Sequence, residues 1–365
     1  MSAPRAIDES TDAIANGTAA ASAADRVERL IDLATPFAVR AVASLRVPDL
    51  IKSGTRRLAD LAAAAGAHPD ALGRLLRYLV HRGVFVEQRP GEFGLTELGE
   101  LLCDHGPADK RNWLDFAGLG MRMDLAYTGL LHSVRTGREA YTEVHGHSFW
   151  ADLDADPRRQ LYADGLMTSQ HEITGPQVAR LYDWGSVRTV MDVGGGSGAL
   201  LATVLRAHPH LRGTLIDRPV PARLTAARLA GTDLAGRVEV AYGDFFSPLP
   251  PGGDVYVVSR AISDWDDAEA AAILRRCGEA AGRHGRVLIV EVLPTTPHVP
   301  HLAPFDLQML VVVGGRERSV AGFEALADTA GLSVTSVLHG RDGLMLIECA
   351  AGCTSAEIAP NNGRS

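Results

Sequence analysis

Hydrophobic residues are spaced differently in the two halves of the chain. From Arg26 onward, apolar residues recur at intervals of three and four, as at Val27, Leu30 and Ala34, and this spacing predicts amphipathic helices. After Trp184, short apolar runs alternate with helical stretches. Alternation of strand and helix is typical of a doubly wound parallel sheet, so we expect an α/β domain after a mostly helical one.

The first part of the chain has the pattern of a winged helix. Two short predicted helices, at 55–65 and 69–83, are separated by a turn containing Gly and Pro, and short apolar strands at 84–86 and 93–95 follow. One interpretation is DNA binding by the second helix, which contains three arginines. The other is burial of its apolar side against a second subunit or the rest of the chain. DNA binding would use Arg74, Arg77 and Arg82. Burial would cover the apolar residues Leu72, Leu75, Leu76, Leu79 and Val80.

The later part of the chain alternates regularly and closes with a hairpin. Strands are expected at 189–193, 213–216, 238–240, 255–259 and 286–291, and helices at 199–207, 222–229, 268–281 and 319–330. Two final strands, 332–338 and 344–349, are joined by a polar turn and predict an antiparallel hairpin at the sheet edge.

The region between these two parts is expected to be mostly helical. A helix start is predicted at Asp156-Pro157 and a break at Gly175-Pro176. The expected segments are a disordered tail (1–25), a winged-helix domain (26–110), helices that line a substrate pocket (111–180), a Rossmann-like domain (181–352) and a second tail (353–365).

The composition of the chain argues against several classes of function. The chain has 36 Lys and Arg against 44 Asp and Glu, a net charge of -8, so no general attraction to nucleic acid or an anionic membrane is expected. This balance favours burial of the winged helix over DNA binding. No stretch approaches the roughly 18 apolar residues of a membrane helix, and no signal peptide is apparent. Four scattered cysteines predict neither a disulfide framework nor a metal site, so we expect a cytoplasmic protein.

A glycine-rich loop at 192–198 follows the first strand of the later part and opens a helix. Gly194, Gly196 and Gly198 allow the backbone to turn sharply and approach a ligand closely. The pattern alone also fits a dinucleotide site. Asp217, which ends the next strand, could bind the ribose hydroxyls of a dinucleotide or of S-adenosylmethionine.

Three features favour S-adenosylmethionine over NAD. Asp192 precedes the glycines, where a carboxylate suits a ligand with an amino group better than a pyrophosphate. Asp244 and Phe245 follow the third strand and offer an acid and an aromatic face to an adenine. The closing hairpin is expected in methyltransferase sheets rather than dehydrogenase sheets.

The chain resembles the bacterial small-molecule O-methyltransferases, above all the tailoring enzymes of aromatic polyketide and anthracycline pathways. The matching stretches are 35–40, 72–77, 95–99, 192–198, 243–246, 264–267, 273–275, 306–310 and 314–319. The resemblance implies a homodimer built through the winged-helix domain, S-adenosylmethionine as cofactor and an aromatic small-molecule substrate. The expected cofactor-binding residues are Asp192, Gly194, Gly196, Gly198, Asp217, Asp244, Phe245, Ser259, Arg260 and Trp265.

One family position departs from the pattern. Ser263 stands where most relatives have a histidine as proposed proton acceptor, and a serine hydroxyl is no general base near neutral pH. Asp264 and the family positions Glu291 and Glu317 complete the expected catalytic set. The alternative to a catalytic role is that Glu291 is a solvated acid at the end of a strand. Glu317 would then form a surface ion pair with Arg316 or Arg318.

Loss of the histidine leaves several mechanisms open. Positioning of the reactants alone can suffice, because oriented reactants reach effective molarities of about 10⁵–10⁸ M while a general base supplies about 10²–10⁴-fold. Asp264, Glu291 or His171 are alternative proton acceptors. Met167, His171 and Met309 are the expected substrate residues, and the aromatic segment 141–150 either lines the pocket or is simply packed.

Three functions remain open. The first is O-methylation of a phenolic natural-product intermediate. The second is a cofactor-binding enzyme that has lost methyl transfer and performs hydroxylation or decarboxylation. Some members of the O-methyltransferase family that the chain resembles do so. The third is a DNA-binding regulator.

Overall fold

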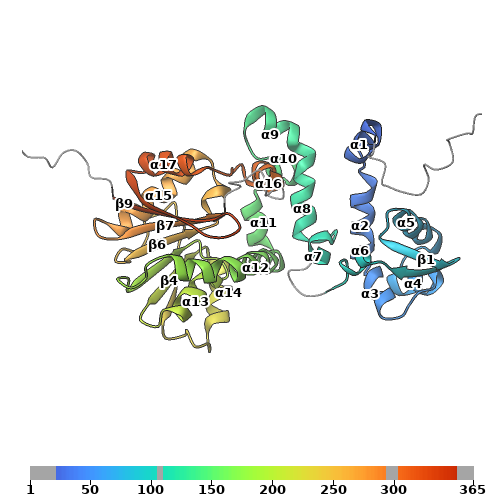
Figure 1. Cartoon of the computed structure of the whole chain (residues 1–365), viewed down its shortest axis with the longest axis horizontal. Helices are drawn as coiled ribbons and strands as arrows, with labels where there is room; N and C mark the ends of the chain where they lie inside the picture. The colour runs from blue at the N-terminus through green and yellow to red at the C-terminus, as the bar shows by residue number, and fades with distance from the viewer. Residues whose placement is uncertain (1–21, 105–109, 293–302, 352–365) are drawn as a thin grey trace, which may run out of the picture. The chain divides into compact units, whose positions relative to one another are not determined.

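The computed structural model describes residues 22–104, 110–292 and 303–351. Contacts divide the chain into two compact units, Met1–Cys103 and Asp104–Ser365 (Figure 1). The two expected tails lie almost wholly outside the described residues, although the first helix begins within the last residues of the first tail. Among the described helices, none combines the length and the hydrophobicity that crossing a membrane would require.

The first unit has the winged-helix order that the sequence predicts. Its elements are α1 (Ala23–Leu30), α2 (Ala34–Ser44), α3 (Val47–Lys52), α4 (Leu58–Ala65), α5 (Pro69–His81), β1 (Phe85–Arg89), β2 (Glu92–Leu95) and α6 (Glu97–Glu100). β1 and β2 pair antiparallel. The helix expected from residue 55 begins only at Leu58, because the Leu58 N–H donates to the Gly91 carbonyl and Arg56 accepts from Phe93, which aligns residues 56–58 along the hairpin.

The apolar side of α5 packs inside its own unit. Leu72, Leu76 and Leu79 are fully buried together with the aromatic rings of Phe85 and Phe93. Burial of the helix against the rest of the chain therefore accounts for these leucines. The most exposed large apolar residues of the unit, Leu30, Ile31 and Leu33, lie instead on α1 and in the turn that follows it.

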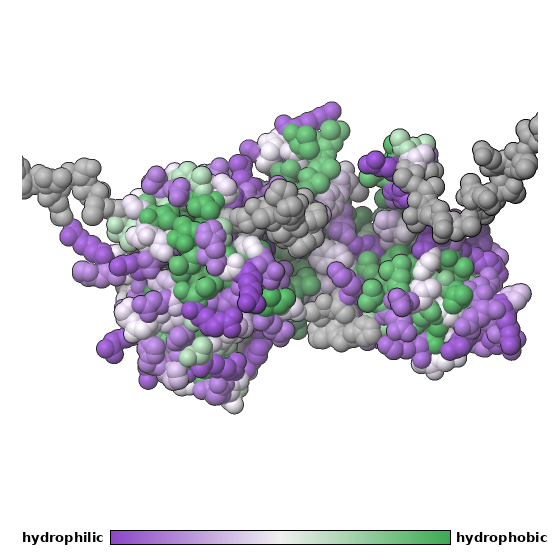
Figure 2. All heavy atoms as spheres, in the orientation of Figure 1, coloured by the Kyte–Doolittle hydropathy of each residue, from purple (hydrophilic) through white to green (hydrophobic). Residues whose placement is uncertain are grey.

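The second unit begins with helices that pack around a helix from much later in the chain. These elements are α7 (Lys110–Leu114), α8 (Leu119–Leu125), η1 (Ala126–Gly129), α9 (Leu130–Thr136), α10 (Tyr141–His145), α11 (Phe149–Ala155), α12 (Pro157–Leu181) and α16 (Ala303–Val313). Leu119, Tyr141 and Leu153 form a buried cluster with Val311 and Val312 of α16. Figure 2 shows an apolar patch on the outside of α9, where Leu131 and Val134 are exposed.

The predicted helix break at Gly175-Pro176 is wrong. α12 starts as expected, with Asp156 as N-cap accepting from the Arg158 N–H, but it continues through Pro176 to Leu181. Gly175 fits closely against α13, since a Cβ placed there would lie 3.3 Å from Thr203 Cβ. Packing on the neighbouring helix therefore maintains a helix that loses one backbone hydrogen bond at the proline.

The predicted doubly wound sheet with a closing hairpin is confirmed. Its strands are β3 (Thr189–Val193), β4 (Arg212–Asp217), β5 (Val238–Tyr242), β6 (Val255–Ser259), β7 (Arg286–Val292), β8 (Leu332–His339) and β9 (Leu344–Ala351), in the order β5-β4-β3-β6-β7-β9-β8. The connecting elements are α13 (Ala199–Ala207), α14 (Pro219–Leu229), η2 (Ile262–Asp264), α15 (Asp267–Ala281) and α17 (Val320–Thr329). β9 runs antiparallel to both β7 and β8, and the other pairs are parallel.

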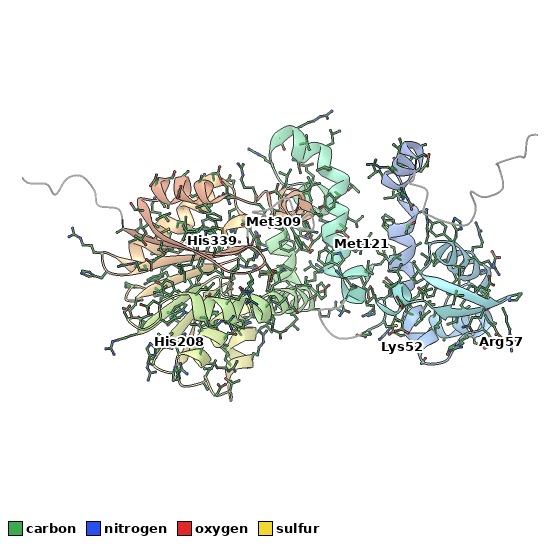
Figure 3. The ribbon with its side chains drawn as sticks, viewed as in Figure 1. Lys52, Arg57, Met121, His208, Met309 and His339 are labelled. Carbon is green, nitrogen blue, oxygen red and sulfur yellow. The ribbon has the colours of Figure 1, made fainter. Side chains whose placement is uncertain are left out.

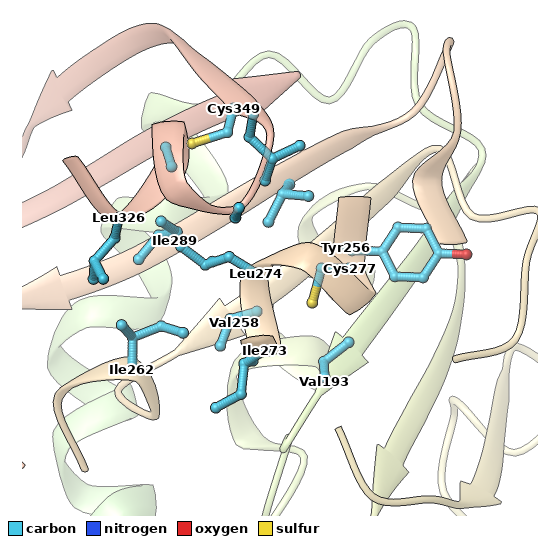
Figure 4. Packing of buried hydrophobic residues seen from close by; sticks show 14 of the residues in the cluster. Val193, Tyr256, Val258, Ile262, Ile273, Leu274, Cys277, Ile289, Leu326 and Cys349 are labelled. Carbon is cyan, nitrogen blue, oxygen red and sulfur yellow. The ribbon is translucent and has the colours of Figure 1, made fainter. Parts of the chain in front are cut away.

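Each face of the sheet carries its own hydrophobic core. α12 and α13 contribute residues such as Val178 and Leu201 to the core on one face. α15 and α17 cover the other, where Leu274, Cys277 and Leu326 pack on strand residues such as Ile289 (Figure 4). Strand order reverses between β3 and β6, and open α/β sheets bind ligands at the carboxyl ends of strands at such a point.

Candidate functional site

The glycine loop leaves the carboxyl end of β3 in a conformation that requires glycine. Gly194, Gly196 and Gly198 have φ values of 72°, 53° and 70°, a region that L side chains avoid. The Gly194 N–H donates to the Ile216 carbonyl at 2.8 Å. A Cβ at Gly196 would meet no atom within 4 Å, so a ligand has open access to the backbone there.

Asp217 holds this loop in place. One of its carboxylate oxygens accepts from the Gly196 N–H and the other from the Arg218 N–H, both at 2.7 Å. Burial raises the pKa of Asp217, and the two backbone N–H groups oppose that shift. The carboxylate that ends β4 therefore links the second strand to the glycine loop of the first.

Asp192 is buried behind the loop with an unused acceptor. Its Oδ2 atom has no hydrogen-bond partner among the described residues. Burial, together with the charge of Asp217, raises the pKa of Asp192 to about 7. A buried carboxylate without a partner is costly, and a cationic ligand group would satisfy it.

An aromatic wall faces the other side of the loop. Phe245 lies against Gly194, because a Cβ at that glycine would be 3.2 Å from Phe245 Cε1. Trp265 packs edge-on against Phe245 at 5.6 Å between ring centroids and stacks on Trp150 at 5.7 Å. Asp244 is exposed beside this wall and accepts from the Phe246 N–H at 2.9 Å.

At the end of β6, two expected cofactor residues meet an expected substrate residue. His171 Nε2 on α12 lies 3.1 Å from Ser259 Oγ. Burial, with Arg260 nearby, lowers the pKa of His171 to about 4, so the imidazole is neutral at physiological pH. Arg260 has a left-handed backbone, φ 54°, which directs the chain away from the strand.

The four expected catalytic residues converge beside Arg260. Arg260 contacts Glu291 Oε2 at 3.5 Å, and Glu291 lies at the end of β7 with no exposed surface. Ser263 and Asp264 lie on η2, and Glu317 follows α16. Burial raises the pKa of Asp264 to about 8 and that of Glu317 to about 7, and the negative charge of Glu291 adds to both shifts. The solvated alternative for Glu291 is thereby wrong.

The alternative interpretation of Glu317 was a surface ion pair with a neighbouring arginine. Among the described residues, Glu317 forms no such ion pair. Arg316 and Arg318 both pair with Asp267. The Glu317 N–H donates to Asp306 Oδ1 at 2.8 Å, while Glu317 Oε2 is buried without a partner among the described residues. Glu317 therefore has a buried carboxylate oxygen that accepts no hydrogen bond from the described residues.

Arg318 is a structural residue that the sequence prediction missed. Its buried guanidinium donates to the Trp265 carbonyl at 2.7 Å, to the Ile262 carbonyl at 3.1 Å and to Asp267. These bonds hold both ends of η2. The only sequence signal was its place in the matching stretch 314–319.

Tyr141 and Phe149, two aromatic residues of the segment 141–150, are buried. Asp152 is buried and accepts from Tyr141, His147 and Arg122. Trp150 is the member that reaches the aromatic wall. Met167 on α12 and Met309 on α16, the latter labelled in Figure 3, are half-buried, and no bond ties either to the residues above.

Family models match most of the chain. Residues 27–105 match the O-methyltransferase dimerisation domain and residues 127–333 match the O-methyltransferase domain. The chain is 47% identical over 322 residues to the 2,7-dihydroxy-5-methyl-1-naphthoate 7-O-methyltransferase of Streptomyces carzinostaticus, covering 88% of this chain and 96% of the relative. It is 41% identical to the aclacinomycin 10-hydroxylase of Streptomyces purpurascens, covering 85% of this chain and 84% of the relative.

A solved structure agrees with these matches. An O-methyltransferase from neocarzinostatin biosynthesis, in complex with S-adenosyl-L-homocysteine and 1,4-dihydroxy-2-naphthoic acid, superposes with a TM-score of 0.84 at 46% identity. The match covers 89% of this chain and 98% of that one.

Proposed function

Because the chain belongs to the S-adenosylmethionine-dependent O-methyltransferase family, we propose that it methylates a phenolic hydroxyl of an aromatic natural-product intermediate. The observation that carries the proposal is the likeness, over 88% of the chain, to a methyltransferase that acts on a hydroxylated naphthoate. The buried residues at the carboxyl ends of the strands support it.

The residues at the sheet edge suit S-adenosylmethionine, which supplies a methyl group activated on a sulfonium. The unpartnered Asp192 carboxylate offers an acceptor to the ammonium group. Gly196 leaves room for close backbone approach, and Asp217 lies where a ribose would meet the loop. Asp244, Phe245 and Trp265 would hold the adenine end. Ser259 and Arg260, at the end of β6, and Gly198, at the start of α13, complete the proposed cofactor set.

Positioning supplies most of the rate acceleration in this proposal. Without a histidine at position 263, the enzyme depends on alignment of the hydroxyl with the methyl group, and alignment can contribute about 10⁵–10⁸ M in effective molarity. Met167, His171 and Met309 are the proposed substrate contacts. The neutral His171 would act on the substrate through packing and hydrogen bonding rather than through charge.

A second subunit completes the proposed enzyme. The dimerisation-domain match and the exposed apolar residues of α1 and the α1–α2 turn support a homodimer built through the first unit. DNA binding by α5 has less support, because Arg82 pairs with Asp32 at 2.9 Å and Arg77 with Glu87 at 3.8 Å.

A cofactor-binding enzyme without methyl transfer is the second candidate. Its support is the 41% identity to a protein named as a hydroxylase, together with Ser263 at the position of the usual base. Turnover distinguishes the two candidates. We expect purified protein, S-adenosylmethionine and a panel of hydroxynaphthoates and related phenols to yield a product heavier by one methylene group. A product that instead gains oxygen or loses carbon dioxide would support the second candidate.

A further inference from the structure

Ser197 is the residue of the glycine loop that meets the long helix α12. Its side chain is buried, with 4% of the residue exposed. The Ser197 hydroxyl lies 2.9 Å from the hydroxyl of Thr168 on α12, within hydrogen-bonding distance. The Thr168 hydroxyl also bonds the Asp164 carbonyl one turn earlier on the same helix, at 2.7 Å. A hydroxyl pair between residues 29 positions apart therefore joins the loop to the helix.

The helix α14 binds the backbone of the same loop. The buried Thr225 hydroxyl donates to the Gly196 carbonyl at 2.6 Å. Arg228 donates to the Ser197 carbonyl at 2.7 Å. The second terminal nitrogen of the Arg228 guanidinium lies 3.5 Å from a carboxylate oxygen of Asp164 on α12. The loop, α14 and α12 are thus joined in a closed set of contacts around Ser197.

Asp164 is the residue of α12 that Arg228 contacts. It is buried, and its other carboxylate oxygen accepts from the Gln160 side chain at 2.8 Å. Burial raises the pKa of Asp164, and the bond from Gln160 and the charge of Arg228 oppose that shift. Because a buried carboxylate is costly without such partners, the contact with Arg228 favours one position of α12 relative to the loop.

The part of α12 that is held in this way also carries the proposed substrate contacts. Met167 directly precedes Thr168, and His171 follows it by one helical turn. His171 in turn contacts Ser259 of the proposed cofactor set at 3.1 Å. The helix therefore meets the proposed cofactor site at two places, the glycine loop and the end of β6. Displacement of a reacting group by about 1 Å can slow a reaction by about 10²-fold, so the position of this helix matters for rate.

We propose, on the basis of the methyl transfer proposed above, that Thr168 is a positioning residue. By its bond to Ser197 it fixes α12 against the glycine loop, and it thereby holds the substrate hydroxyl in line with the methyl group of the cofactor. Thr168 acts through the helix and contacts neither ligand. Such a residue suits an enzyme without a histidine base, in which alignment of the reactants supplies most of the rate acceleration.

The test measures methyl transfer to a hydroxynaphthoate in a single turnover, with both ligands saturating. We expect Thr168→Val, which keeps the shape but not the hydroxyl, to lower the rate constant about 10-fold or more while affinity for S-adenosylhomocysteine changes by no more than about twofold. Thr168→Ser keeps the hydroxyl and should stay within about twofold of the wild-type rate. Thr174→Val is the matched control and should leave the rate unchanged, since Thr174 is half-buried on the same helix and its hydroxyl bonds the Gln170 carbonyl of that helix.

Ser197→Ala removes the same bond from the loop and should slow methyl transfer to a similar degree. The double variant Thr168→Val, Ser197→Ala should be no slower than the slower single variant, because both changes remove one interaction. Calorimetry of S-adenosylhomocysteine binding shows whether each variant is folded, and if Thr168→Val is not, Ser197→Ala decides the question.

The outcomes separate the positioning role from the reaction itself. A wild-type rate for Thr168→Val would overturn the positioning role, as would an equal loss for Thr174→Val or for Thr168→Ser. Losses that multiply in the double variant, or a loss confined to cofactor affinity, would overturn it as well. A wild-type enzyme that methylates no phenol would instead overturn the proposed function, and the positioning role with it.

Discussion

Asp192 gives the site a pH dependence that can be measured without turnover. Its pKa is raised to about 7 by burial and by Asp217, so the free protein holds the proton below neutral pH. If an ammonium group binds the ionised carboxylate, binding releases that proton. Affinity for S-adenosylmethionine should then rise with pH, approaching about tenfold per pH unit below pH 7 and levelling off above pH 8.

Calorimetry between pH 5.5 and 8.5 tests this prediction. Asp192→Asn should weaken binding and remove the pH dependence, because the amide neither ionises nor takes up a proton. Asp233→Asn is the matched control, since Asp233 is an exposed aspartate of the same unit that pairs with Arg206. Affinity of the wild-type protein that does not vary with pH would refute the assignment of the ammonium group to Asp192.

At the residue scale, the positions of residues along the sequence predicted which of them lie at the same sheet edge. They did not predict which hydrogen bonds these residues form. Residues at the carboxyl ends of parallel strands meet at one sheet edge, which is why Asp192, Asp217 and Glu291 could be placed together. The contact of His171 with Ser259 joins residues 88 positions apart, and nothing local encodes it. The three bonds of Arg318 to η2 are equally non-local.

At the element scale, α12 is the helix where local sequence rules fail. A proline preceded by a glycine predicts a break, yet burial of Gly175 against Thr203 on α13 maintains the helix. The strands of the seven-stranded sheet and the helices α13 and α15 were predicted almost to their ends, because their apolar runs are bounded by turn residues. Helix ends set by tertiary pairing, such as the late start of α4 at Leu58, were not.

Two glycines of α12 offer a matched test of this packing. Gly175→Val should destabilise the protein by about 1–3 kcal/mol, because its side chain would meet Thr203. Gly165→Ala, where a Cβ would meet no atom within 4 Å, should stabilise it by about 0.5–1 kcal/mol through helix propensity alone. Urea unfolding monitored by circular dichroism measures both. A Gly175→Val variant as stable as the wild type would show that this contact does not maintain the helix.

At the scale of the whole molecule, the first unit carries the prediction of a homodimer. Leu30 is 85% exposed and Leu33 is 70% exposed, unusual for large apolar side chains unless a partner covers them. We expect sedimentation to find a dimer, and the double variant Leu30→Glu, Leu33→Glu to be a monomer. Tyr242→Glu, at an exposed position of the sheet, serves as control and should remain dimeric. A wild-type monomer at micromolar concentration would contradict the prediction.

Composition and pattern together predicted the class of the whole molecule. The net charge of -8 argued against nucleic acid, and the alternation after Trp184 with its closing hairpin predicted the fold that the sheet order confirms. The substrate could not be predicted in the same way. Its identity depends on how side chains from distant parts of the chain surround it, and periodicity says nothing about that arrangement.

The central claim is methyl transfer to a phenol without a histidine base, and its most direct test is a stoichiometry. The protein is incubated with methyl-labelled S-adenosylmethionine and a hydroxynaphthoate, and labelled product and S-adenosylhomocysteine are counted together. The account predicts one S-adenosylhomocysteine for each labelled product, in step throughout the reaction. Consumption of the aromatic substrate while the S-adenosylmethionine stays intact would contradict it.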